Sequence, residues 1–173
     1  MAQLERRGQE SERLDQSPLA ATELSGKSMF KHLLLPTDGS PSSEDAIGQA
    51  MAFAKGARAQ VTGLYVMPEF HVLTYRVAMV EDTKAEFTAD CRAHARQYLD
   101  VIQRAADRAA VSCRTLSVSS DHPFEAIIAS AEKNACDLIV MASHGRQGLR
   151  ALLLGSETLK VLTHSKIPVL VLR

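Results

Sequence analysis

Short, uninterrupted apolar runs alternate along this chain with longer segments whose apolar residues recur at helical spacing. The short runs are typical of strands that are covered on both faces of a parallel sheet, and the longer segments are typical of amphipathic helices. The sequence therefore predicts an α/β fold, a single domain built on an open five-stranded parallel sheet with helices on both faces. The expected strands are 32–37, 60–67, 112–119, 137–141 and 168–172.

Local capping signals place helices between these strands. Ser40 is a suitable N-cap before Pro41, which fits the first helical position, and Gly56 is expected to end this helix as a C′ residue. A long amphipathic helix is expected over about 81–110. Two further helices are expected, one that opens near 121–125 and ends at Asn134, and one over 156–163.

The composition limits the classes of partner. The 173 residues suit one domain, and 20 Lys and Arg balance 20 Asp and Glu, so the chain has no basic field for nucleic acid. No apolar stretch approaches the roughly 20 residues that span a bilayer, and the first residues lack the apolar core of a signal peptide. The three widely separated cysteines fit a reducing compartment. We therefore expect a cytoplasmic protein with no membrane or nucleic-acid partner.

The beginning of the chain differs in character from the rest. Residues 1–28 are charged and polar with few large apolar groups, which predicts a disordered N-terminal tail. The ordered pattern begins at Met29 and continues to the last residue. The folded domain is therefore expected to cover 29–173.

A segment rich in glycine and small residues follows the fourth expected strand. Ala142 and Gly145 stand at its start, and after nine residues Gly155 and Ser156 stand where the last helix should begin. Backbone N–H groups in such loops and at helix starts bind phosphate. The segment is neither a Walker A motif nor a G-x-G-x-x-G fingerprint. Its spacing alone leaves two interpretations open, a phosphate-binding loop and glycines that only serve turns.

Three features that are far apart in the sequence are expected to meet at one edge of the sheet. In an open parallel sheet, ligands bind beyond the carboxyl ends of the strands, at the point where the winding direction changes. Residues 36–38 follow the first strand, Val66 lies at the end of the second, and 142–156 follow the fourth. The sequence therefore predicts a single binding site.

Four segments of the chain also carry a family resemblance: 34–40, 137–146, 153–156 and 168–171. In this order they resemble the universal stress protein family, and the resemblance covers about residues 29–173. It implies a Rossmann-like fold of the adenine nucleotide alpha hydrolase-like kind. It also implies a homodimer that pairs through the terminal strand 168–172.

ATP-binding members of that family carry the pattern G-x2-G-x9-G-[ST], which falls on 142–156 of this chain with one departure. Ala142 stands in place of the first glycine. Its methyl group would crowd a closely approaching ligand, although the loss is small if the backbone there is extended. The resemblance thus implies ATP as the cofactor, with Mg²⁺ or Mn²⁺ held mainly by the phosphates and water. The histidines and cysteines lack ligand spacing, so we expect no protein metal site.

The resemblance implies roles for individual residues. Pro36, Thr37 and Asp38 would surround the adenosine, with Asp38 accepting a ribose hydroxyl. The backbone of Val66 would lie beside the adenine edge. The residues expected on the phosphate side are Ala142, Ser143, His144, Gly145, Arg146, Gly148, Gly155, Ser156, Glu157 and Thr158.

The leading hypothesis is an ATP-binding stress-response protein that acts as a signalling or protective module. Because no water-activating base or arginine finger can be named, we expect no catalytic residue and at most slow ATP hydrolysis or self-phosphorylation. One alternative is a dimeric stress protein that has lost nucleotide binding and acts through partner contacts, with Ala142 as its support. The other is an ATP-dependent adenylylating enzyme, which would need a second substrate pocket.

Overall fold

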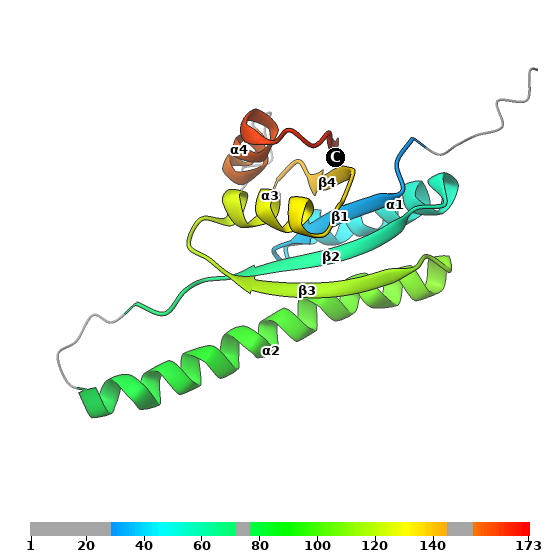
Figure 1. The fold of residues 1–173 in the computed structure, drawn as a ribbon. Helices are drawn as coiled ribbons and strands as arrows, with labels where there is room; N and C mark the ends of the chain where they lie inside the picture. The colour runs from blue at the N-terminus through cyan, green and yellow to red at the C-terminus, as the bar shows by residue number, and fades with distance from the viewer. Residues whose placement is uncertain (1–28, 72–76, 145–153) are drawn as a thin grey trace, which may run out of the picture.

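In the part of the chain that the structure describes, a sheet of five parallel strands forms the centre of the protein (Figure 1). The computed structural model describes residues 29–71, 77–144 and 154–173, and in the long second helix it describes side chains from Thr83 onward. The strand order is β3-β2-β1-β4-β5. The predicted α/β class and parallel sheet are therefore confirmed. The strands are β1 (His32–Thr37), β2 (Gln60–Met67), β3 (Cys113–Ser119), β4 (Leu138–Ala142) and β5 (Val169–Leu172).

Within the described residues, four helices cover the two faces of the sheet (Figure 1). They are α1 (Pro41–Ala57), α2 (Val77–Ala109), α3 (Pro123–Lys133) and α4 (Ser156–His164). Successive residues of β1 point to opposite faces, as the strand period requires. Leu33 and Leu35 join the core under α1 and α2, whereas Leu34 joins the core under α3 and α4. The expected helices on both faces are thus present.

The two ends of α1 test the capping signals separately. Ser40 is the N-cap, and its hydroxyl accepts a hydrogen bond of 3.2 Å from the backbone N–H of Ser43, as predicted. The expectation that Gly56 ends the helix as its C′ residue is wrong. The helix continues through Ala57, and Arg58 takes the left-handed conformation with φ of 51°. After this turn Ala59, the residue before β2, is buried, and its N–H bonds the Ala54 carbonyl of α1.

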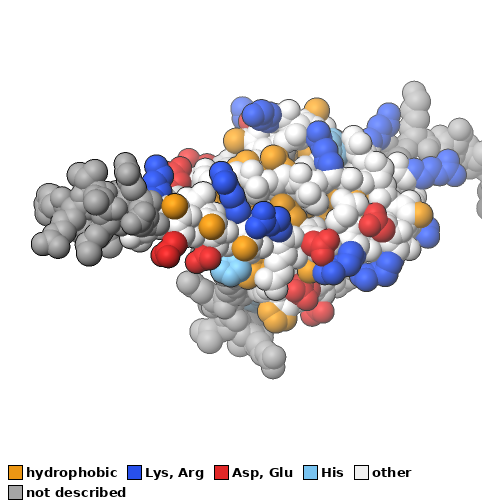
Figure 2. All heavy atoms as spheres, turned by 90° about the horizontal axis from the view of Figure 1, so that it is seen from below, with side chains coloured by type: hydrophobic (Ala, Val, Ile, Leu, Met, Phe, Trp, Pro, Cys, Tyr) orange, Lys and Arg blue, Asp and Glu red, His pale blue; other side chains and the backbone are white. Residues whose placement is uncertain are grey.

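The second helix is longer than its amphipathic pattern indicates, because it begins at Val77 and not near residue 81. Its carboxyl-terminal half packs on β2 and β3 through buried residues such as Ile102 and Ala106. Its amino-terminal half extends past the sheet (Figure 1). Basic and acidic side chains are interspersed over the face that α2 presents in Figure 2, and one pair, Arg104 and Asp100, lies at 3.0 Å.

A buried polar network lies at the amino ends of the strands, under α3. His32 is almost fully buried, and its Nε2 atom lies 2.8 Å from the hydroxyl of Thr62. Arg114 donates to the same hydroxyl at 2.9 Å. Burial, followed by the charge of Arg114, lowers the pKa of His32. The network is therefore suited to a neutral histidine.

The carboxylate of Asp137, the residue before β4, links β4 to β1 by hydrogen bonds. It accepts hydrogen bonds from the backbone N–H groups of Lys31 at 2.8 Å and His32 at 3.0 Å.

The neighbouring residue Cys136 is buried, and burial raises the pKa of its thiol to about 11. All three cysteines are free thiols. Within the described ranges, no helix is long and apolar enough to cross a bilayer.

Candidate functional site

The strand registers bring most of the predicted site residues to one edge of the sheet. β1 lies between β2 and β4, at the point where the winding of the chain reverses. Thr37 pairs with Tyr65, so Asp38 lies level with Val66 on the next strand. The register between β1 and β4 pairs Leu34 with Ile139, and its continuation places Thr37 beside Ala142. The predicted convergence of 36–38, Val66 and the end of β4 is therefore present in the fold.

The turn after β1 is held by its own polar groups. The carboxylate of Asp38 accepts the N–H of Ser40 at 3.0 Å, which is an Asx-type turn. The Thr37 hydroxyl accepts the N–H of Gly39 at 3.2 Å and lies 2.9 Å from the Ser43 hydroxyl. Gly39 has a φ of 72°, a conformation that favours glycine. The hydroxyl of Thr37 thus stabilises the turn that carries Asp38.

The end of β4 holds the start of α4 in place. Ser143 donates its N–H to the carbonyl of Leu172 at 2.7 Å and accepts the N–H of Gly155 at 2.8 Å. The Thr158 hydroxyl donates to the carbonyl of Ala142 at 3.0 Å. Gly155 is the N-cap of α4, as its sequence position predicts. The first turn of α4, whose N–H groups lack helical acceptors, therefore lies beside the carboxyl end of β4.

The two ring nitrogens of His144 differ in their surroundings, and this difference indicates what the site could bind. Its Nδ1 atom lies 2.8 Å from the hydroxyl of Ser143. Its Nε2 atom is buried and has no hydrogen-bond partner within the part of the chain that the structure describes. When the serine O–H donates to Nδ1, the neutral ring carries its proton on Nε2, which becomes a donor. A buried polar group without a partner costs about 1 to 3 kcal/mol, so this nitrogen is suited to an acceptor on a ligand.

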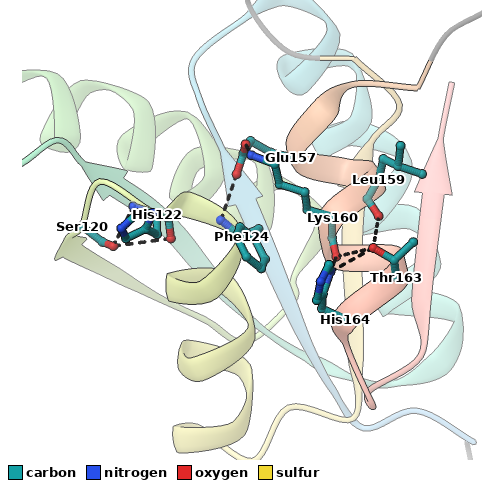
Figure 3. Close-up of polar contacts among 8 residues, drawn as sticks. All are labelled: Ser120, His122, Phe124, Glu157, Leu159, Lys160, Thr163 and His164. Atoms are coloured by element: carbon teal, nitrogen blue, oxygen red, sulfur yellow. Dashed lines mark hydrogen bonds and ion pairs between the residues drawn. The ribbon is translucent and has the colours of Figure 1, made fainter.

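Glu157 has partners within the protein, at the start of α3 and in α4 itself. One carboxylate oxygen accepts the N–H of Phe124 at 3.0 Å, and the other lies 2.7 Å from the Lys160 ammonium (Figure 3). The same lysine lies 5.5 Å from the centre of the Phe124 ring. The carboxylate therefore links the first turn of α4 to the first turn of α3. The exposed Ser156 remains at the sheet edge.

Some predicted residues contribute in ways that the sequence does not reveal, and others cannot be placed. Gly145, Arg146 and Gly148 lie outside the described residues. Tyr98 of α2 was not predicted at the site, yet its ring lies against Gly39. Its sequence position indicates only the apolar face of a helix, so no local signal separates it from ordinary core residues.

The arrangement is suited to binding a charged ligand. It offers a carboxylate at Asp38, a candidate donor at His144 Nε2, and the start of a helix that favours anions. Among the described residues, no three His, Cys, Asp or Glu side chains are grouped so that they could hold a metal ion. The fold defines a Rossmann-like α/β protein, and its candidate ligand site lies at the carboxyl ends of β1 and β4.

Comparison with known proteins gives the family. The chain belongs to the universal stress protein family, whose model matches residues 29–173. Universal stress protein MJ0531 of Methanocaldococcus jannaschii is 30% identical over 149 residues, which are 86% of this chain and 85% of that protein. The solved structure of MJ0577 from the same organism has a TM-score of 0.71 and 31% identity, and the match covers 83% of this chain and 96% of that one.

Two more distant structures of the family's fold contain adenine nucleotides. One is a universal stress protein in complex with cAMP, with a TM-score of 0.57 and 24% identity over 83% of this chain and 97% of that one. The other is a family protein from Arabidopsis thaliana with AMP bound, with a TM-score of 0.58 and 14% identity over 82% of this chain and 90% of that one. At these identities the likeness shows the shared fold alone.

Proposed function

We propose that the protein binds an adenine nucleotide, and ATP in particular, at the carboxyl ends of β1, β2 and β4. The observation that carries this proposal is the buried Nε2 atom of His144, which has no hydrogen-bond partner among the described residues and belongs to the residue after Ser143, whose carbonyl holds the N-cap of α4. A phosphate oxygen is a strong acceptor and would satisfy it. The nucleotides bound by the cAMP and AMP complexes agree with this choice of ligand. The bound protein would act as a stress-response signalling or protective module.

Each part of the nucleotide has a suitable partner on this edge. The Asp38 carboxylate, oriented by its bond to Ser40, would accept a ribose hydroxyl. The backbone of Val66 would lie beside the adenine edge, while its side chain packs in the core under α3 and α4. His144 and the start of α4 would contact phosphate. Mg²⁺ or Mn²⁺, if it accompanies ATP, would be held by phosphate oxygens and water.

The departure at Ala142 is compatible with this function. Ala142 is the last residue of β4, pairs with Leu172, and is not among the described non-glycine residues with positive φ. A glycine's conformational freedom is therefore not needed there. This observation argues against the alternative in which the family fold is kept and nucleotide binding is lost.

Calorimetric titration with ATP, ADP, AMP and adenosine tests the proposal. We expect His144→Ala to weaken ATP binding by about 10-fold or more, because a hydrogen bond to a charged group contributes roughly 1.5 to 3 kcal/mol. Adenosine binding should stay unchanged. The matched control is His164→Ala, at the exposed end of α4. If millimolar ATP produces neither heat nor thermal stabilisation of the unmodified protein, the proposal is refuted.

We further propose that binding takes place without dedicated catalysis, in the cytoplasm, where the three free thiols would stay reduced. Among the described residues at this edge, the Ser–His contact between two side chains joins adjacent residues, Ser143 and His144, and the serine is buried. Slow hydrolysis or self-phosphorylation is the most we expect. Steady adenylate transfer to a small acid would support the enzyme alternative instead.

A second copy of the chain is the partner that we propose for the free edge of β5. Pro168 and Leu172 direct their carbonyls to β4, so by strand alternation the backbone of Val169 and Val171 faces outward. Both flanking helices add apolar groups on this side. Leu159 and Leu162 of α4 are 52% and 39% exposed. An open edge flanked by apolar side chains is suited to strand pairing.

The α1 side of the same edge also carries an exposed apolar group. Gln49 of α1 donates to the carbonyl of Arg173 at 3.2 Å, so this part of the helix lies beside the end of β5. Phe53, one helical turn further along, is 36% exposed and packs against Phe30 at 6.4 Å between ring centres. The proposed dimer surface therefore extends over both helical layers.

Val171→Pro tests the dimer because proline removes an outward N–H that the sheet itself does not use. Val171→Ala keeps that N–H and is the matched control. By analytical ultracentrifugation at micromolar concentration, we expect a dimer for the unmodified protein and for Val171→Ala, and a monomer for Val171→Pro. A monomeric unmodified protein would contradict the proposal.

A further inference from the structure

Tyr98 of α2 lies directly against the turn that carries Asp38. A Cβ atom built on Gly39 would overlap the Cδ1, Cε1 and Cζ atoms of the Tyr98 ring. The ring is itself held on two sides. Tyr65 of β2 contacts it at 5.3 Å between ring centres with a tilt of 56°, and His94 stacks on it at 6.0 Å and 17°. Of these three rings, the middle one, Tyr98, therefore lies against Gly39.

The turn is fixed from two directions. On the β1 and α1 side, hydrogen bonds from Ser40 to Asp38 and from Gly39 to Thr37 hold its backbone. On the α2 side, the Tyr98 ring occupies the space into which Gly39 would otherwise move. Because the Asp38 carboxylate bonds a backbone group of the same turn, its position depends on both supports. If a smaller side chain replaced Tyr98, the backbone at Gly39 could move into the freed space, and the Asp38 carboxylate would shift with it.

We propose that Tyr98 is a positioning residue of the nucleotide site, which acts by holding the Asp38–Gly39 turn so that the Asp38 carboxylate meets the ribose hydroxyls. The inference rests on the proposed nucleotide function. Tyr65 packs against the Tyr98 ring at a tilt, and the exposed His94 stacks on it. The long helix α2 thus contributes to ligand recognition through the Tyr98 ring.

The competing explanation is that Tyr98 only fills the core. A core residue would stabilise the whole domain, so its loss would weaken every ligand alike. A residue that acts through Asp38 must instead affect only ligands that carry the ribose hydroxyls. Its effect must also disappear when Asp38 is absent, because coupled residues are not additive.

The experiment compares ATP with 2′,3′-dideoxy-ATP by calorimetric titration of the full chain. We expect Tyr98→Leu to weaken ATP binding by about 5- to 10-fold, within the range of measured couplings between contacting residues. Binding of the dideoxy nucleotide should change by less than about 2-fold. Tyr98→Phe keeps the ring and should retain the affinity for both ligands. In an Asp38→Ala background, Tyr98→Leu should cause no further loss.

His94→Ala gives a second measurement that leaves the core untouched, because His94 is exposed. It should cause a smaller loss, again for ATP and not for the dideoxy nucleotide. Equal losses for both nucleotides, or additive effects of Tyr98→Leu and Asp38→Ala, would overturn the inference while the nucleotide site stands. An unmodified protein that binds neither nucleotide would overturn the proposed function and this inference together.

Discussion

Two glycines of this chain should respond in opposite ways to the same substitution. Gly39 has a φ of 72°, and a Cβ atom there would overlap the Tyr98 ring. Gly48 lies inside α1, where an added Cβ would meet nothing within 4 Å. Gly39→Ala is therefore expected to destabilise the protein, whereas Gly48→Ala should stabilise it by removing a flexible residue from a helix.

The magnitudes follow from the separate contributions. A left-handed backbone costs an alanine about 1 to 2 kcal/mol. Extra volume against a packed ring costs roughly 1 to 3 kcal/mol. The reduced entropy of the unfolded chain offsets about 0.4 to 1 kcal/mol. We therefore expect Gly39→Ala to lower the free energy of unfolding by about 2 to 4 kcal/mol, and Gly48→Ala to raise it by about 0.5 to 1 kcal/mol.

Urea unfolding followed by far-ultraviolet circular dichroism measures both changes. In thermal unfolding, a domain of this size should lose roughly 5 to 15 °C in Tm with Gly39→Ala. In a Tyr98→Leu background the overlap is gone and only the backbone strain remains, so the cost of Gly39→Ala should fall by about half. The reasoning is refuted if Gly39→Ala is neutral, or if its cost is the same with and without the Tyr98 ring.

Two further predictions concern other parts of the fold. Because burial lowers the pKa of His32 below its ordinary value of about 6.5, the unfolded chain takes up a proton first as the pH falls. The free energy of unfolding should therefore drop from about pH 6.5 downward, and it should drop to a smaller extent in His32→Asn. Glu157→Ala should cost about 1 kcal/mol in urea unfolding, because the N–H of Phe124 loses its carboxylate acceptor, whereas the exposed Glu132→Ala should stay within about 0.5 kcal/mol. Equal effects of the two glutamates would contradict the role given to Glu157.

The parallel sheet could be predicted because its signals are local. The apolar run of β1 and the Ser40–Pro41 start of α1 each identify their element without knowledge of the rest. The end of α1 could not be predicted in this way. Arg58 takes the left-handed conformation at the point where Ala59 enters the core. The burial of Ala59 depends on β2 and α2, which lie elsewhere in the sequence.

The candidate site divides in the same way. Asp38 follows β1 and Val66 lies near the end of β2, so the shared edge of a parallel sheet is enough to bring them together. Tyr98 carries no such signal, since its spacing on α2 matches that of the buried Ala95 and Ile102. Glu157 has the sequence position of a phosphate-side residue, yet its carboxylate bonds the start of α3. That contact depends on the packing of two helices and has no local pattern.

The pairing of β1 with β4 has a consequence for how the domain folds. His32 and Asp137, which meet at this pairing, are 105 residues apart, so closing the seam costs loop entropy that neighbouring strands avoid. Asp38 comes from one side of the seam and His144 from the other. A ligand that bridges them would bind only the closed seam and stabilise it by mass action. Amide hydrogen exchange in Leu33 and Leu138, which face each other across it, would then slow when the ligand binds.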